Sequence, residues 1–347
     1  MSYTNGLDKP TDYFNTVLYV GNNSTNVITG VGFQPDFVWL KDRVNANSHN
    51  VYDVVRGTTK ALLPNLTNAE ITRTTGLTSF DSDGFTLGSY GGHNESSGNV
   101  AWNWLADNTS GSSNTDGSIT STVSANTTSG FSIVSYTGNG TLSTVGHGLS
   151  SSPSFFVIKD RDNGTYDWFA YHKSLGATKY LRLSGTDAST TSSVLWNDTE
   201  PTSSVFTIGG SFLGGNTNGN NYIAYCFAEK KGFSKAFSYT GNGSTDGTYI
   251  HLGFKPAWFM IKKSSASGDS WVIIDNTRFP YNYVDKFIYA DEADAESGSA
   301  ERLDILSNGI KLKATHTFIN TSGATYIGIA FAENPFVTST GIPACAR

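Results

Sequence analysis

Cysteine and long apolar runs are both scarce in this sequence. Two cysteines, Cys226 and Cys345, occur among 347 residues, so we expect no disulfide framework and synthesis in a reducing cytosol. No apolar stretch approaches the roughly 20 residues that a membrane-spanning helix needs. Residues 1–6 lack the charged and apolar regions of a secretory signal. The sequence therefore predicts neither membrane insertion nor signal-dependent secretion.

Charged residues make up only 15% of the chain, and the formal net charge is −6. No basic stripe with interleaved aromatic residues is present, so the electrostatic footprint of a nucleic-acid-binding protein is missing. Apolar residues at helical spacing are missing as well. The chain is rich instead in glycine (37 residues), in aromatic residues (13%) and in Ser, Thr and Asn. Because aromatic and β-branched residues favour strands while Gly and Asn favour turns, this composition predicts an all-β protein.

The chain contains three copies of one pattern. Each copy begins with Tyr-x-Gly-Asn, continues with a Gly-containing element and an apolar run, and closes with an aromatic-rich segment. The opening tyrosines are Tyr19, Tyr136 and Tyr239, and the closing segments are 100–104, 222–229 and 326–333. Copies roughly 100 residues apart are domain-sized and too long for solenoid or propeller repeats. With their short strands and frequent turn signals, they predict tandem antiparallel β-sandwich modules of jelly-roll-like layout.

The predicted boundaries follow from these copies. A lead-in at 1–12 precedes the first module at 13–107, and the second and third modules occupy 131–231 and 232–337. Residues 108–130, rich in Ser, Thr, Asn and Gly, are interpreted as a flexible or lightly ordered linker. The second and third modules are joined directly, which predicts a fixed contact between them. Residues 338–347 form a short tail.

Local signals predict several strand ends and turns. Residues 80–87 place an Asp-Gly pair between two strand-like segments, a strong hairpin signal. Pro256 cannot donate to a sheet ladder, so it marks the start of the strand that follows. That strand, at 258–261, is apolar on both faces, as a central strand would be. The glycines of the Tyr-Thr-Gly-Asn-Gly turns are expected to supply a positive φ.

Motifs for catalysis or metal binding are absent, including Gly-x-Ser-x-Gly, His-Glu-x-x-His and paired Cys-x-x-Cys. We therefore predict no catalytic residue, no metal and no cofactor. His147, His172 and His251 are interpreted as polar residues at strand ends. Asp81–Gly84 resembles a fragment of a calcium loop, but the closing Glu is absent and a turn is the better interpretation. The acidic residues of 291–296 are interpreted as a solvated loop.

Glu229 and Glu333 occupy equivalent positions at the ends of two closing segments. Glycoside hydrolysis needs two acids that face each other across a groove. Acids matched by position in separate modules more often cap a turn. Spacing alone leaves enzymatic action open.

Loop aromatics beside Asn and Asp are the candidate ligand-binding residues. They are Trp196, Asn197 and Asp198 in the second module and Tyr281, Asn282 and Tyr283 in the third. An aromatic face can stack on a sugar ring while amides and carboxylates pair with hydroxyls, so we predict glycan contacts at these loops. The alternative interpretation is that the rings cover a sandwich edge or a seam between modules.

The motifs at 19–22, 32–41, 53–57, 80–88 and 101–104 resemble a repeat domain of virion proteins in tailed phages, especially marine and cyanobacterial ones. The other two modules match the same pattern, so the resemblance covers nearly all of 13–337. It supplies no catalytic or ligand residue. It implies a virion component, assembled in the host cytoplasm, with other virion proteins as partners and a homo-oligomer, expected to be a trimer.

Residues and resemblance together predict a non-enzymatic structural protein. The first hypothesis is a short tail fibre or tail-tip protein that binds a host surface polysaccharide through multivalent weak contacts. The alternatives are a capsid decoration or head fibre protein and, from another class, a polysaccharide-degrading tailspike enzyme. We recognise no anchoring domain or coiled coil before the first module, which favours decoration, whereas the aromatic, Asn-rich loops favour recognition.

Overall fold

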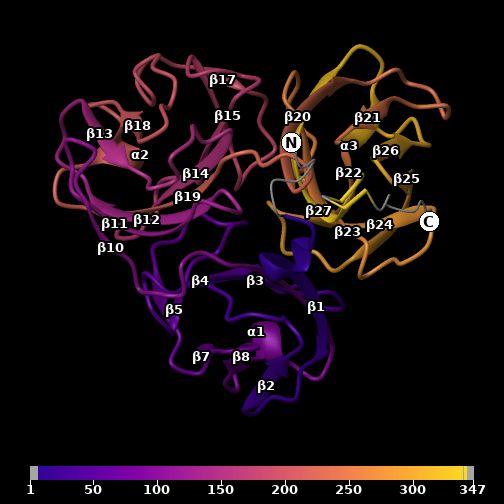
Figure 1. Cartoon of the computed structure of the whole chain (residues 1–347), viewed down its shortest axis with the longest axis horizontal. Coiled ribbons are helices and arrows are strands. Elements are labelled where there is room, and N and C mark those ends of the chain that lie inside the picture. Colours follow the sequence, from indigo (N-terminus) through magenta and orange to yellow (C-terminus); the bar gives the residue numbers. More distant parts are fainter. Residues whose placement is uncertain (1–6, 339, 342–347) are drawn as a thin grey trace.

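The computed structural model describes residues 7–338 and 340–341, without the side chains of 299–301. Residues 1–6 of the lead-in and residues 339 and 342–347 of the tail, with Cys345, lie outside the described residues. Nearly all regular structure is antiparallel β-sheet, which confirms the all-β prediction. Three lobes, one for each repeat, are arranged around a common centre (Figure 1).

The first module has two main sheets, ordered β1-β9-β3-β4 and β2-β8-β7, with a small β5-β6 pair beside them. Its elements are η1 (Pro10–Asp12), β1 (Phe14–Val20), β2 (Asn26–Thr29), β3 (Phe37–Asp42), β4 (Asn50–Asp53), β5 (Lys60–Ala61), β6 (Ile71–Thr72), β7 (Leu77–Asp81), β8 (Gly84–Leu87), α1 (Gly91–Asn94) and β9 (Gly98–Trp104).

The second module repeats this layout with a longer first sheet, β10-β11-β12-β19-β14-β15-β16-β17, and a β13-β18 pair. Its elements are β10 (Ser112–Asn114), β11 (Ser121–Asn126), β12 (Phe131–Thr137), β13 (Ser143–Gly146), β14 (Phe155–Asp160), β15 (Phe169–His172), β16 (Lys179–Arg182), β17 (Thr190–Thr191), β18 (Val205–Ile208), α2 (Leu213–Asn216) and β19 (Asn221–Phe227).

In the third module the two sheets merge into one, ordered β20-β27-β22-β23-β24-β25-β26-β21. Its elements are β20 (Ser234–Thr240), β21 (Tyr249–His251), β22 (Phe254–Lys263), β23 (Val272–Asp275), β24 (Val284–Tyr289), β25 (Ser297–Leu306), β26 (Gly309–Leu312), α3 (Thr317–Asn320) and β27 (Thr325–Pro335).

The stretch 108–130, interpreted above as a linker, belongs to the sheet of the second module. It forms β10 and β11, and β11 pairs with β12 along its whole length. Its larger apolar residues, Ile119 and Val123, are buried in that module's core. An outermost strand with one face toward solvent needs few apolar residues, so its composition is close to that of a linker.

The equivalent edges of the other two modules are treated differently. Among the described strands, β1 and β20 end their sheets. Asn15 Oδ1 accepts the backbone N–H of Thr16 at 2.9 Å on β1, and Glu229 Oε1 accepts that of Ala236 at 2.8 Å on β20. In the second module β11 covers the equivalent edge. In the other two modules, side chains accept some of the backbone N–H groups that lie along it.

The hairpin prediction is confirmed, because Asp81 and Gly84 pair across a two-residue turn between β7 and β8. The prediction that Pro256 marks the start of a strand is wrong, because β22 already begins at Phe254. Pro256 lies instead at an irregularity of the β22–β27 ladder, where its missing N–H removes no regular bond. The predicted central strand at 258–261 is confirmed, since this part of β22 lies between β27 and β23 and is buried.

The glycines of the Tyr-Thr-Gly-Asn-Gly turns have two different roles. A Cβ at Gly138 would lie 2.4 Å from the carbonyl oxygen of Thr217, so the first glycine permits close approach to the end of α2. The second, Gly140, has φ +70° and supplies the positive φ that we predicted. The third module repeats both roles at Gly241 and Gly243.

A buried asparagine at the end of each one-turn helix holds these turns in place. The three are Asn94, Asn216 and Asn320. Each side-chain oxygen accepts the backbone N–H of the motif asparagine, at 2.9 to 3.2 Å. Each Nδ2 donates to backbone carbonyls of neighbouring loops. The repeated motif is therefore a docking element of the fold.

One aromatic core joins the three modules. It contains Trp104, Phe227 and Phe331, which occupy equivalent places on β9, β19 and β27. Their ring centroids form a triangle with sides of 6.3, 5.6 and 5.6 Å. Full burial of one such side chain is worth about 1.5–3 kcal/mol, so separating the modules would expose a large apolar surface.

The strand ends beside this core are polar, and each reaches into the next module. The equivalent positions are Asp53, His172 and Asp275, the last residues of β4, β15 and β23. Tyr225 of the second module donates its hydroxyl to Asp53 at 2.7 Å. His172 Nε2 donates to the carbonyl of Gly328 in the third module at 3.1 Å. Trp102 of the first module donates its Nε1 to Asp275 at 3.0 Å. These contacts close a ring around the centre.

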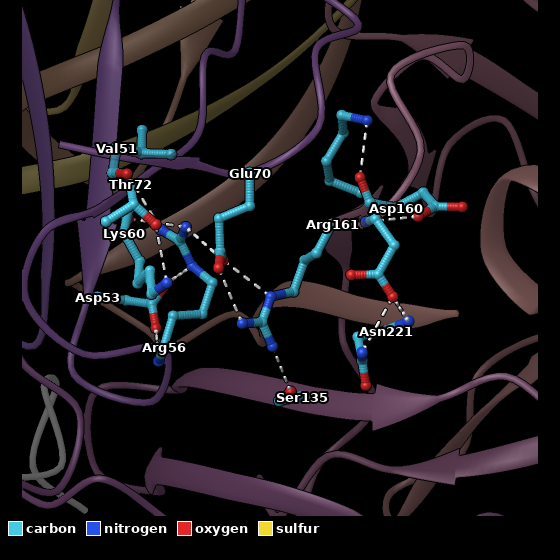
Figure 2. Close-up of polar contacts among 12 residues, drawn as sticks. Val51, Asp53, Arg56, Lys60, Glu70, Thr72, Ser135, Asp160, Arg161 and Asn221 are labelled. Atoms are coloured by element: carbon cyan, nitrogen blue, oxygen red, sulfur yellow. Dashed lines mark hydrogen bonds and ion pairs between the residues drawn. The ribbon is translucent and has the colours of Figure 1, made fainter. Parts of the chain in front are cut away.

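At two of these positions the aspartate, Asp53 or Asp275, forms a buried ion pair with an arginine. Arg56 Nε lies 2.5 Å from Asp53, and Arg278 Nε lies 2.5 Å from Asp275, with no exposed side-chain surface on any of the four. Figure 2 shows that the first pair continues across the module boundary, because Glu70 bonds both Arg56 and Arg161. A buried charge requires such partners.

In the second module the aspartate, its arginine and the donor from the neighbouring module are all replaced together. Leu175 stands where the other modules have arginine, and Ile329 stands where Tyr225 and Trp102 donate. An aspartate at position 172 would therefore have neither partner. His172 needs none, because burial lowers its pKa to about 4 and keeps the imidazole neutral.

A second ring of contacts uses the residues four positions earlier. These are His49, Trp168 and Trp271. Their ring nitrogens meet the carbonyls of Tyr289, Leu63 and Arg182, at 2.9, 3.0 and 2.8 Å. Each contact again crosses a module boundary, so the two rings fix the three modules as one body.

We expect His172→Asp to lower the free energy of unfolding by about 3 kcal/mol or more, because it buries a carboxylate without a partner. Adding Leu175→Arg and Ile329→Tyr should recover much of this loss by restoring the set used in the first module. Urea unfolding of the single and triple variants, with Ile329→Tyr as control, measures both effects. A triple variant no more stable than the single would contradict the exchange of partners.

Stability should depend on pH through His172. The folded pKa is about 4, below the unfolded value of about 6.5. Its contribution is therefore present above pH 6.5 and is lost as the pH falls toward 4. From pH 7.5 to 5.0 the wild type should lose about 2 kcal/mol more than His172→Gln, measured by urea unfolding. Equal losses in both proteins would refute this.

Candidate functional site

Trp196 is not a ligand-binding residue. It is 1% exposed, packs in the core of the second module and donates its Nε1 to the carbonyl of Lys179 at 3.1 Å. The prediction of a stacking platform there is wrong, and the alternative of a structural ring is right. The indole fills the space beside Phe156 and Phe212, where a large apolar side chain gains most from burial.

Asn197 and Asp198 are exposed and have positive φ, so they form a turn at the surface. Asn197 borders a shallow hollow of about 370 Å³ on the outer face of the β13-β18 pair. Thr144, Thr199 and Thr207 line the same hollow. The arrangement offers hydroxyl and amide groups to a neutral polar ligand.

The third-module candidates are exposed as predicted. Tyr281 is 80% exposed and Tyr283 is 49% exposed. Asn282 exchanges two hydrogen bonds with the backbone of Ile305, at 2.9 and 3.0 Å, so its amide anchors the loop to β25. Arg302, also on β25, lies 4.6 Å from the centre of the Tyr283 ring.

The outer face of this sheet holds residues that the sequence analysis missed. Asp304 on β25 pairs with Lys311 on β26, and Lys311 pairs with Tyr249 on β21. Tyr249 is 42% exposed. Alternation of apolar and polar residues along β25 and β26 is the signal that marks this face, and it lies outside the loops that attracted attention.

In the described part of the chain, exposed aromatic side chains are found in the third module. In residues 7–338 and 340–341, the exposed rings of Phe, Tyr and Trp are those of Tyr249, Tyr281 and Tyr283. The rings of the other two modules are buried or half-buried there. If rings contact a ligand at the surface, the third module carries them.

Groups with shifted pKa values serve the fold. Lys41, Lys159 and Lys262 are fully buried, and burial lowers the pKa of each to about 8. Their ammonium groups donate to backbone carbonyls, which for Lys41 and Lys262 include a carbonyl of another module. Burial also lowers the pKa of His93 to about 3, and among the described residues its ring nitrogens have no partner.

Glu200 and Glu229 line one depression of about 310 Å³, so the two-carboxylate arrangement of a glycosidase has to be considered. Glu200 accepts the hydroxyl of Tyr171 and the backbone N–H of Ala177. Glu229 forms an ion pair with the ammonium of Lys173 at 2.5 Å. Both acids are committed to structural partners. Glu333, the other predicted turn cap, lies in the third module and pairs with Lys255.

The acidic loop at 291–296 and the turn at 81–84 have structural partners too. Glu296 bonds Arg43 of the first module at 2.6 Å, and Asp83 accepts the backbone N–H of Gly32 at 2.7 Å. Across residues 7–338 and 340–341, His, Cys, Asp and Glu form no group of three or more that could hold a metal ion.

The centre of the molecule is packed. An apolar cavity of about 30 Å³ lies between the modules, lined by rings such as Phe37, Trp104 and Trp258. It has no polar lining, and a cavity of this kind stays dry. The shared core is therefore a joint between modules.

Residues 9–335 match a family described as a domain of unknown function (DUF7483), and the chain belongs to that family. The match spans all three modules, so the family unit is the three-module body and not a single module. Comparisons with curated proteins and with solved structures found no match. In the part of the chain that the structure describes, every helix is too short or too polar to span a bilayer.

Truncation separates the structural ring from the exposed one. Trp196→Ala should lower the free energy of unfolding by about 3–5 kcal/mol because it empties a core site. Tyr281→Ala should change it by less than about 0.5 kcal/mol because the side chain faces solvent. Thermal and urea unfolding measure both. A mild effect of Trp196→Ala would restore that residue as a surface candidate.

Proposed function

We propose that this protein is a non-enzymatic structural component of a phage virion, a short tail fibre or tail-tip protein that contacts a glycan on the host surface. The observation that carries the proposal is that, among the described residues, the exposed rings lie on one face and one loop of the third module. Exposed tyrosines gathered in one module suit stacking on sugar rings, because each offers an apolar face and a polar hydroxyl. The sequence resemblance to repeat domains of phage virion proteins is the basis for proposing that the protein is part of a virion.

The rigid ring of modules supports a mechanical role. Modules joined by a common core and by hydrogen bonds and ion pairs across their boundaries resist relative movement, so the outer faces keep fixed positions. Binding loops on such a scaffold lose little entropy when they meet a ligand. Other virion proteins are the proposed partners, and a homotrimer is the proposed oligomer, in which weak contacts add.

Capsid decoration is the second candidate. A compact body with blunted sheet edges can be placed in many copies on a shell without pairing to its neighbours. A tailspike enzyme is the third, and the depression that holds Glu200 and Glu229 is where its acids would have to be.

Immunogold electron microscopy, with antibody against the purified chain and particles whose genome encodes it, tests the location. Gold at the tail tip is the expected result. Gold spread over the head would favour decoration, and unlabelled particles would refute a virion role.

Enzymatic action is tested separately. The purified chain is incubated with host surface polysaccharide, and new reducing ends are measured. We expect none. Release of oligosaccharide that Glu200→Gln and Glu229→Gln abolish would replace the proposal with the enzyme.

A further inference from the structure

We infer that the outer face of β25, β26 and β21 binds an acidic polysaccharide. This inference rests on the proposed contact with a surface glycan and names the ligand class and the residues. Arg302 and Asp304 point outward from β25, because they alternate with Leu303 and Ile305, which are buried. Lys311 lies outward on β26 for the same reason.

Register places these side chains in two rows. One row is Asp304, Lys311 and Tyr249, which are direct cross-strand partners. The other is Arg302 and Lys313, since the backbone N–H of Lys313 donates to the carbonyl of Arg302 at 2.7 Å. Neighbouring strands lie about 5 Å apart, so the first row crosses about 10 Å of sheet and the second about 5 Å. An extended chain of sugars could lie along them.

Two tyrosines border the rows. Tyr283 stacks with the Arg302 guanidinium at 4.6 Å on one side, and Tyr249 is exposed on the opposite edge strand. A ring at each side of a row of charges can stack on two separate sugars. Charged groups between the rings then choose among sugars.

The charges favour an anion. Among the side chains that the structure describes, three cations, Arg302, Lys311 and Lys313, share the face with two carboxylates, Asp246 and Asp304. The Lys311 contact is 2.7 Å, but Asp246 is 87% exposed and water competes for it. The Lys313 contact is longer, at 3.9 Å. A positive excess on a chain of net charge −6 is selective for an acidic ligand, and a guanidinium pairs with a carboxylate through two parallel bonds.

The other modules lack this combination at equivalent positions. Val27 of the first module occupies the place of Tyr249, and Thr86 that of Lys311. In the second module both places are threonines, Thr144 and Thr207. The repeated fold therefore does not require an aromatic or a charged side chain at the positions of Tyr249 and Lys311.

Binding to polygalacturonate, by calorimetry or surface plasmon resonance, tests the inference. Tyr249→Ser and Arg302→Gln should each weaken binding about fivefold or more, and the double variant more than either. Salt at about 0.5 M should weaken it further. Dextran and poly-glutamate, a neutral sugar and an anion without sugar rings, should bind much more weakly.

Matched controls are Val27→Ser, at the equivalent strand position, and Arg73→Gln, which removes the arginine stacked at 4.0 Å on Tyr90 in the first module. Both should bind as the wild type does. Equal binding to dextran, or full binding by Tyr249→Ser and Arg302→Gln, would overturn this inference while leaving glycan contact in place. Failure to bind any polysaccharide, with gold absent from the tail, would remove the proposed function as well.

Discussion

The aromatic core shared by the modules is the constraint on which the rest of the structure depends. Each module presents one sheet face to the centre, and Trp104, Phe227 and Phe331 meet there. Dry surroundings leave the neighbouring strand ends with polar groups that water cannot reach. Those groups must find partners in the adjacent module, which is why the contacts run around the centre as closed rings.

The contacts between the strand ends and the adjacent modules differ from one module to the next. Where a neighbour offers a hydroxyl or an indole N–H, the strand ends in aspartate held by arginine. Where the neighbour offers Ile329, the strand ends in a neutral histidine that bonds to a backbone carbonyl. The three copies therefore differ as matched sets of residues, and each set follows from what faces it across the boundary.

Much of the fold could be read from the sequence, but its assembly could not. The repeated pattern identified the modules and the closing strands, and the Asp-Gly pair identified the hairpin at Asp81–Gly84, because these depend on local spacing. The ring of modules depends on pairs such as Asp53 with Tyr225, far apart in the chain, for which one sequence gives no pattern. The interpretation of 108–130 was wrong because an edge strand and a linker have the same composition.

The candidate site was read unevenly for the same reason. Tyr281 and Tyr283 were found because an aromatic loop is visible in sequence. Trp196 was misjudged because burial is set by strands elsewhere, and Lys311 was overlooked because its meaning lies in its cross-strand neighbours. Surface chemistry on a sheet is a property of register.

The capped edges of β1 and β20 have a consequence for crowding. Where many copies of a protein lie close together, bare strand edges promote sheet-to-sheet polymerisation into fibrils. Asn15 and Glu229 occupy backbone donors that a neighbouring copy would need for such growth. Neighbouring copies can thus pack closely without joining their sheets.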